Sequence, residues 1–106
     1  MLVEEIFMKK QATDNGAVLQ LSGELVFIDS QDFMREAALR VEDDGPNIVF
    51  DMADLKFIDS AGLGAILYLS EALRMRGQKL EIRNANDNNK KLLKTIQNVG
   101  TFTVAD

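Results

Sequence analysis

The pair Asp59-Ser60 places a carboxylate beside a hydroxyl, directly before an apolar segment with helical periodicity. A serine in this setting could act as a nucleophile, accept a phosphoryl group or cap the helix. Nucleophilic catalysis needs a base, and the sequence contains no histidine and no cysteine. Lys56 has no helical or strand spacing that would aim its amine at Ser60. We therefore expect that the protein is not an enzyme.

Two further patterns that could do chemistry are incomplete. Gly62-Leu63-Gly64 begins like a dinucleotide-binding loop, but the third glycine of that fingerprint would fall at Leu67. Asp51 ends an apolar run as a phospho-accepting aspartate would, but Glu24 stands alone where that chemistry wants an acidic pair. We interpret Asp51 as a strand end that binds loop amides. Without histidine or cysteine there is no Cys/His zinc site, and neither a metal nor a cofactor is predicted.

The residues alone allow two interpretations of Ser60. In the first, either Asp59 or Ser60 is the helix N-cap and accepts a hydrogen bond from a first-turn amide, contributing about 1 kcal/mol. In the second, Ser60 is phosphorylated, and the phosphate lies at the free amides and positive dipole end of the helix. The phosphate would add about −1.5 to −2 charge beside Asp59, so the fold would tolerate it while a docked partner would not.

Gly62 and Gly64 lie inside the expected helix, where each costs about 1 kcal/mol relative to alanine. One explanation is close packing of the helix start on the sheet. The other is close approach by the backbone of another protein or by a bulky group on Ser60. The residues alone leave both explanations open.

The composition narrows the possible partners. The 106 residues carry 12 Lys+Arg against 17 Asp+Glu, a formal net charge of −5. Nucleic acid and anionic membrane surfaces bind basic faces, so neither is predicted as a partner. Glu4 and Glu5 stand where a signal peptide would be basic. The apolar helix after Ser60 stops at Glu71, too short to span a bilayer. We expect a single cytoplasmic domain over residues 1–106, without membrane insertion.

The first half of the chain is expected to form a hairpin and a helix. Asn15-Gly16 is typical of a hairpin turn, which would join a strand within residues 2–13 to a returning strand over residues 17–22. Asp29 or Ser30 is expected to cap the helix that follows. The apolar stripe of that helix consists of Phe33, Ala37 and Val41.

The middle of the chain leads to the Asp59-Ser60 pair. Residues 47–51 form an apolar run typical of a buried strand. The chain is then expected to leave the sheet over residues 51–54 and to return to the apolar interior at residues 57–58. A second helix follows Ser60 and runs to about Arg76, with Gly77 as its C-terminal stop.

The second helix has more apolar surface than packing on a sheet requires. Ile66, Leu69 and Leu73 make one stripe, and Leu63 and Leu67 make a second beside it. A helix that packs on one surface needs a single stripe. This helix is therefore either deeply buried or turned in part toward a partner, which includes a second copy of the chain as a homodimer.

The last part of the chain is expected to add a strand, a helix and a short strand. Residues 79–83 alternate in polarity, and Asn86 or Asp87 would cap the third helix. Residues 101–104 would form the last strand. The apolar stripe of the third helix consists of Leu92, Leu93, Ile96 and Val99. The predicted class is α/β with the element order β-β-α-β-α-β-α-β.

Three segments of the chain resemble the STAS domain, the fold of bacterial anti-sigma factor antagonists. Phe57-Ile58-Asp59-Ser60-Ala61-Gly62-Leu63-Gly64 resembles the family signature. Leu21-Ser22-Gly23-Glu24-Leu25 is similar to the end of the family's second strand, and residues 47–55 to its third strand and the loop after it. The resemblance implies a small mixed sheet with helices packed against it, over nearly the whole chain.

The resemblance also implies a mechanism of partner switching. An unmodified antagonist binds an anti-sigma factor that is also a serine kinase, and this frees the sigma factor. The kinase phosphorylates the signature serine, the complex dissociates, and a PP2C-type phosphatase restores the active form. By position, the phospho-acceptor would be Ser60. The partner-binding residues would be Asp59, Ser60, Ala61, Gly62, Leu63 and Gly64.

One residue departs from the family pattern. Val26 follows Gly-Glu-Leu where the family often has an aspartate, which affects the expected docking ahead of the first helix. Two other outputs of the same fold are open. One is a phospho-switch that regulates a partner other than a sigma factor system, in secretion, biofilm control or a signalling assembly. The other is a subunit of a transport complex, in which Ser60 is only a helix cap.

Overall fold

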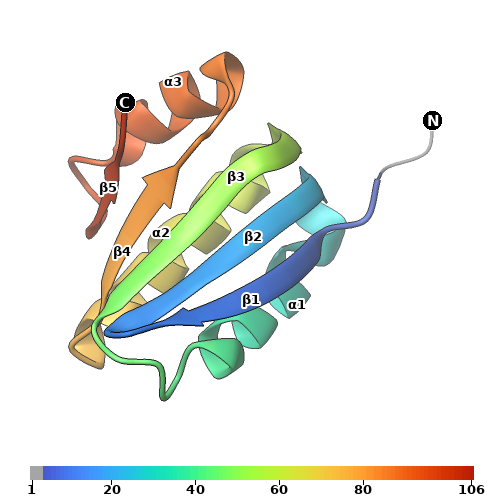
Figure 1. Ribbon diagram of the computed structural model, residues 1–106. Coiled ribbons are helices and arrows are strands. Elements are labelled where there is room, and N and C mark those ends of the chain that lie inside the picture. The colour runs from blue at the N-terminus through green and yellow to red at the C-terminus, as the bar shows by residue number, and fades with distance from the viewer. Residues whose placement is uncertain (1–3) are drawn as a thin grey trace.

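The computed structural model describes residues 4–106, which form a five-stranded sheet and three helices (Figure 1). The sheet order is β1-β2-β3-β4-β5, with β1 antiparallel to β2 and the other pairs parallel. The element order and the mixed sheet agree with the sequence prediction. The elements are β1 (Phe7–Thr13), β2 (Gly16–Leu25), α1 (Phe27–Arg40), β3 (Asn47–Ile58), α2 (Ser60–Met75), β4 (Lys79–Arg83), α3 (Asp87–Ile96) and β5 (Phe102–Val104).

The predicted hairpin joins β1 to β2. β1 ends at Thr13, which pairs with Gly16 at the start of β2. Gly16 is required for packing, because a Cβ there would lie 1.6 Å from the Asn47 carbonyl oxygen at the start of β3. The part of the predicted first strand before Glu4 lies outside the described residues.

The core lies between the sheet and the helices α1 and α2, which cover its rear face in Figure 1. Leu19, Phe50 and Ile82 are register neighbours on β2, β3 and β4, and all three are fully buried. The ring of Phe33 from α1 meets Phe50 edge-on, with centroids 6.0 Å apart. Because side chains alternate along a strand, the next register position, which includes Gln20, faces away from these helices.

Two strands are longer than predicted. β2 continues past Ser22 to Leu25, and β3 continues past Asp51 to Ile58 instead of leaving the sheet. The extensions pair with each other across two shifts of register, and Leu25 lies opposite Ile58. The prediction for residues 57–58 is correct for Ile58, which is buried, and wrong for Phe57, which is 48% exposed.

The first helix starts earlier than predicted. Val26 occupies the N-cap position with extended backbone angles, and α1 begins at Phe27. The predicted caps Asp29 and Ser30 are therefore wrong, and the Ser30 hydroxyl donates to the Phe27 carbonyl oxygen instead. Phe27 and Ile28 are each 78% exposed, so they are not part of the buried apolar stripe and the periodicity of the sequence does not indicate a helix start here. The predicted stripe of Phe33, Ala37 and Val41 is buried.

The later elements follow the prediction more closely. In α2, Ile66, Leu69 and Leu73 are buried, and α2 ends one residue before Arg76, with Gly77 at a φ of 78°. Asn86 caps α3 by accepting a hydrogen bond from the Asn89 amide at 2.8 Å. The predicted stripe of α3 is wrong for two residues: Leu92 is exposed, and Val99 lies beyond the end of the helix at Ile96 and is 79% exposed.

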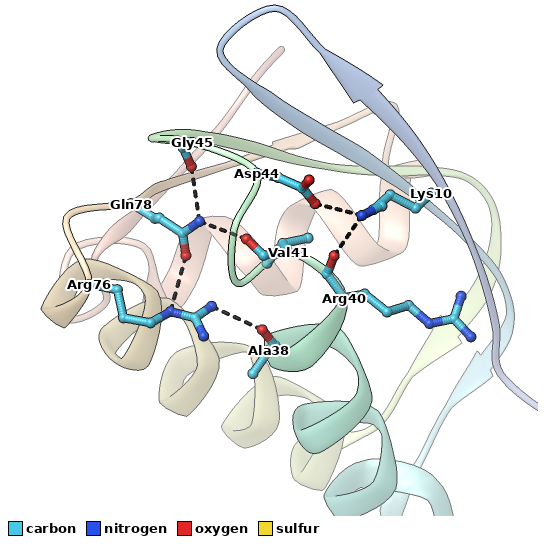
Figure 2. A network of polar contacts seen from close by, with 8 residues as sticks. All are labelled: Lys10, Ala38, Arg40, Val41, Asp44, Gly45, Arg76 and Gln78. Carbon is cyan, nitrogen blue, oxygen red and sulfur yellow. Dashed lines mark hydrogen bonds and ion pairs between the residues drawn. The ribbon is translucent and has the colours of Figure 1, made fainter.

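Side chains from the α2–β4 connection hold the C-terminal end of α1 (Figure 2). The buried Gln78 amide donates to the carbonyl oxygens of Val41 at 2.8 Å and Gly45 at 2.9 Å. The Arg76 guanidinium donates to the carbonyl oxygen of Ala38 at 3.1 Å. The carbonyl groups of Ala38 and Val41 lie at the C-terminal end of α1, where a helix leaves such groups without partners of its own.

A lysine from the edge strand adds to this C-terminal cap. Lys10 Nζ donates to the Arg40 carbonyl oxygen at 2.9 Å and to the Asp44 carboxylate at 2.8 Å (Figure 2). A positive charge at this end of the helix also complements the helix dipole. The end of α1 is thus fastened both to β1 and to the connection after α2.

We expect Gln78→Ala to lower the free energy of unfolding by about 1–3 kcal/mol, because it removes a buried amide that donates to the carbonyl oxygens of both Val41 and Gly45. Urea denaturation measures the change. Gln11→Ala is the matched control, since Gln11 is exposed on β1 and should shift stability by less than about 0.5 kcal/mol. Equal effects of the two substitutions would contradict a structural role for Gln78.

Candidate functional site

Two helices begin side by side at the carboxyl ends of β2 and β3 (Figure 1). The two parallel strands end in register at Leu25 and Ile58, and each is followed by a single residue before its helix. The Asp59 amide donates to the Leu25 carbonyl oxygen at 3.1 Å and ties the two ends together. The starts of α1 and α2 are therefore neighbours although they are far apart in the sequence.

The Asp59 carboxylate joins the two helix starts. Its Oδ1 accepts a hydrogen bond from the Gly62 amide of α2 at 2.8 Å. Its Oδ2 accepts one from the Phe27 amide of α1 at 3.0 Å. Of the two predicted caps for α2, Asp59 is therefore the N-cap and Ser60 is not. The negative charge lies at the positive dipole ends of both helices, which stabilises both.

Ser60 is the accessible serine of the four in the sequence. It is the first residue of α2 and is exposed. Ser30 and Ser70 are buried, and their hydroxyls donate to backbone carbonyl oxygens within their own helices. Ser22 is half-buried in β2. Since Asp59 performs the capping, the Ser60 hydroxyl is not needed as the cap.

The two glycines of the signature have different environments. A Cβ on Gly62 would lie 2.4 Å from the Leu25 carbonyl oxygen, so this glycine is explained by close packing of α2 on β2. A Cβ on Gly64 would meet nothing within 4 Å, and the residue is exposed. The structure thus assigns packing to Gly62 and leaves Gly64 without an internal explanation.

The exposed side of α2 continues from Ser60 along the helix. Ser60, Gly64 and Tyr68 follow one another at intervals of four residues and share this side, which we call the α2 outer face. Tyr68 is 68% exposed. Leu63, from the second predicted stripe, is half-buried against the core beside this face. Beyond its buried stripe, the apolar surface of α2 is therefore partly buried at Leu63 and exposed to solvent at Tyr68.

Lys56 does not serve as a base for Ser60. Its ammonium group forms an ion pair with the Glu4 carboxylate at 2.5 Å. The hydrogen bond and charge of Glu4 raise the pKa of Lys56 above its ordinary value. A general base needs a pKa lowered toward neutrality, so this environment acts in the opposite direction.

Asp51 is occupied by structural hydrogen bonds, as predicted, although β3 does not end there. Its Oδ1 accepts from the Ala53 amide at 3.0 Å and from the Asn84 side-chain amide at 3.1 Å. Among residues 4–106, no group of three or more His, Cys, Asp or Glu side chains is arranged to hold a metal ion. None of the helices in the same range is long and apolar enough to cross a membrane.

Together, these features define an α/β domain with an exposed serine at the start of its second helix. Residues 7–105 match the STAS domain family, and the chain belongs to that family. No curated protein matches the sequence. Comparison with solved structures shows how widely this fold is shared.

Similar structures include antagonists and a transporter. An anti-sigma factor antagonist from Mycobacterium paratuberculosis has a TM-score of 0.70 and 20% identity, covering 93% of this chain and 86% of that one. SpoIIAA of Bacillus, solved unphosphorylated and phosphorylated, has a TM-score of 0.67 and 18% identity, covering 96% of this chain and 89% or 92% of those. The murine Slc26a9 anion transporter has a TM-score of 0.73 and 13% identity, covering 97% of this chain but 21% of that one.

The structure explains the consequence of having valine at position 26, where the family pattern often has an aspartate. Val26 is the N-cap position of α1, where an aspartate would be among the best capping residues. Valine has no oxygen to offer, so α1 has no side-chain cap of its own. Local sequence pattern does not predict the hydrogen bond from the Phe27 amide to the Asp59 carboxylate, because the two residues are 32 positions apart.

We expect opposite effects from alanine at the two glycines. Gly62→Ala should destabilise the fold by about 1–3 kcal/mol because its methyl group clashes with the backbone of Leu25. Gly64→Ala should stabilise it by about 1 kcal/mol because the methyl group meets open space and alanine favours the helix. Thermal and urea denaturation of the pair measure both. Destabilisation by Gly64→Ala would contradict the assignment.

Proposed function

We propose that the protein is an anti-sigma factor antagonist controlled by phosphorylation of Ser60. In its unphosphorylated form it binds an anti-sigma factor that is a serine kinase, and the sigma factor is released. Phosphorylation ends the binding. The observation that carries the proposal is the exposed Ser60 hydroxyl at the start of α2, left free because Asp59 provides the cap.

The proposed modification is a phosphoryl transfer from ATP held by the kinase. Ser60 Oγ attacks the γ-phosphorus, an Oγ–P bond forms, and the bond from the γ-phosphorus to the β,γ-bridging oxygen breaks. ADP leaves, and the hydroxyl proton passes to a base of the kinase. A PP2C-type phosphatase reverses the state by hydrolysis: water attacks the phosphorus, inorganic phosphate leaves, and the Ser60 hydroxyl is restored.

The α2 outer face suits a switchable contact. Gly64 has no side chain and its surroundings are open, so the backbone of a partner can approach α2 closely. Ser60 lies one turn before Gly64 on this face. A phosphate there adds about −1.5 to −2 charge at the start of this face and next to Asp59, so a partner meets like-charge repulsion and the cost of desolvating the phosphate. A single phosphorylation can therefore end the interaction without any other change of charge in the interface.

The other outputs of this fold have less support from the site. A transport-complex subunit needs no phosphorylated serine, whereas this chain has an exposed serine that is free of a capping role. The likeness to the transporter covers 21% of that longer chain and concerns the fold. A switch acting on a partner outside sigma factor control would use the same site, and identification of the partner separates it from the antagonist.

A paired capture experiment tests the proposal. Unmodified protein, Ser60→Asp and the charge control Gln11→Glu serve as baits in lysate of the source organism, and mass spectrometry identifies what each retains. We expect a serine kinase to be retained by the unmodified protein and by Gln11→Glu, and to bind Ser60→Asp at least about tenfold more weakly. The control adds one charge at an exposed position on β1, away from α2.

Two further results complete the test. The captured kinase should phosphorylate the protein with ATP at Ser60 and leave Ser60→Ala unmodified. Gly64→Ala should weaken kinase binding although it stabilises the fold, which separates a contact role from a folding role. Retention of one partner by all baits, or phosphorylation at another residue, would overturn the proposal.

A further inference from the structure

The first turn of α1 depends on a side chain from outside that helix. Its N-cap residue, Val26, offers no side-chain acceptor. The Phe27 amide instead donates to Asp59 Oδ2 at 3.0 Å. The Asp29 amide donates to the Val26 carbonyl oxygen at 3.0 Å and closes the turn. Asp59 is thus the side chain that caps α1 as well as α2.

The Asp59 carboxylate can hold both helices only from one position. Oδ1 is bound to Gly62 and Oδ2 to Phe27, so both oxygens are engaged, and a rotation that frees one disturbs the other. The Asp59 amide is also anchored to the Leu25 carbonyl oxygen, which limits movement of the backbone. A competitor for the first-turn amides of α2 would therefore act on α1 as well.

A phosphate on Ser60 would be such a competitor. It would be attached to the first residue of α2, next to Asp59, where helix amides bind phosphate oxygens well. It carries about −1.5 to −2 charge against −1 on the carboxylate, so it binds these amides more strongly and repels Asp59. Both effects move the carboxylate away from its shared position.

We propose that phosphorylation of Ser60 displaces Asp59 and thereby releases the first turn of α1, so that one modification acts on two helix starts. This inference rests on the proposed function of Ser60 as the phosphorylation site. In the unphosphorylated state Asp59 holds the turn that carries the exposed side chains of Phe27 and Ile28. Once the turn is released, these apolar side chains no longer have one fixed orientation for a partner.

The test installs the phosphate without a kinase, by incorporating phosphoserine at position 60 during translation. Amide hydrogen exchange measured by NMR then reports each helix start. We expect the protection of the Phe27 and Asp29 amides to fall about tenfold, the loss of roughly one hydrogen bond. The Gly62 amide resonance should shift as it changes acceptor. The Ala37 amide, deep in α1, should keep its protection.

Two variants separate the coupling from a general loosening. Val26→Thr is nearly isosteric and gives α1 a hydroxyl cap of its own. With phosphoserine at position 60 it should keep Asp29 protected while Phe27 still loses Asp59. Asp59→Asn has one acceptor oxygen for two amides, so it should reduce the protection of Phe27 or Gly62 without any phosphate.

The outcomes distinguish this inference from the proposed function. If phosphoserine shifts Gly62 but leaves the protection of Phe27 and Asp29 unchanged, the coupling is overturned, and local repulsion at Ser60 remains sufficient for the switch. If the installed phosphate releases the first turn of α1 but no kinase modifies Ser60, the coupling holds and the proposed function fails. Equal loss of Asp29 protection with and without Val26→Thr would also overturn the inference.

Discussion

The in-register ending of β2 and β3 is the constraint on which the site depends. Leu25 and Ile58 are buried and paired, so the chain must leave the sheet at the same place from both strands. The Leu25 carbonyl oxygen then accepts the Asp59 amide and leaves no room for a side chain at Gly62. These contacts bring two helix starts so close that one carboxylate reaches an amide from each. The geometry of Asp59 is thus a consequence of strand length and register.

The same arrangement makes α1 and α2 a pair fastened at both ends. At one end Asp59 binds the first amide of α1, and at the other Arg76 and Gln78 bind its last carbonyl groups. All three residues flank α2. The C-terminal contacts include a buried amide and are supported by Lys10 from β1, whereas the N-terminal contact is a single exposed hydrogen bond. A charge added beside Asp59 therefore acts on the weaker end, and the core contacts of α1 hold the rest of the helix in place.

Local signals in the sequence were sufficient for the element order, the hairpin at Asn15-Gly16 and the stop at Gly77, because each depends on neighbours in the chain. They failed where distant residues decide the structure. Beyond Asp51, the buried residues of β3 are Met52, Leu55 and Ile58, a spacing of three instead of two, because this part of the strand pairs with β2 through shifts of register. At Val26 no local cap exists, and the missing acceptor comes from Asp59. The signature residues could be located from sequence. The sequence did not show that Asp59 is the cap, that Gly62 packs on β2 and that Ser60 remains exposed.

The fold itself does not choose between antagonists and transporter domains, since both share it. The site of this chain combines an exposed serine with a glycine that its own structure does not need. Gly62 is required by the backbone of β2, whereas Gly64 costs helix stability and relieves no internal contact. A residue that lowers stability without an internal reason is expected at a functional surface. Because Gly64 lies one turn from Ser60, the contact that would explain this glycine is one that a phosphate on Ser60 would disrupt.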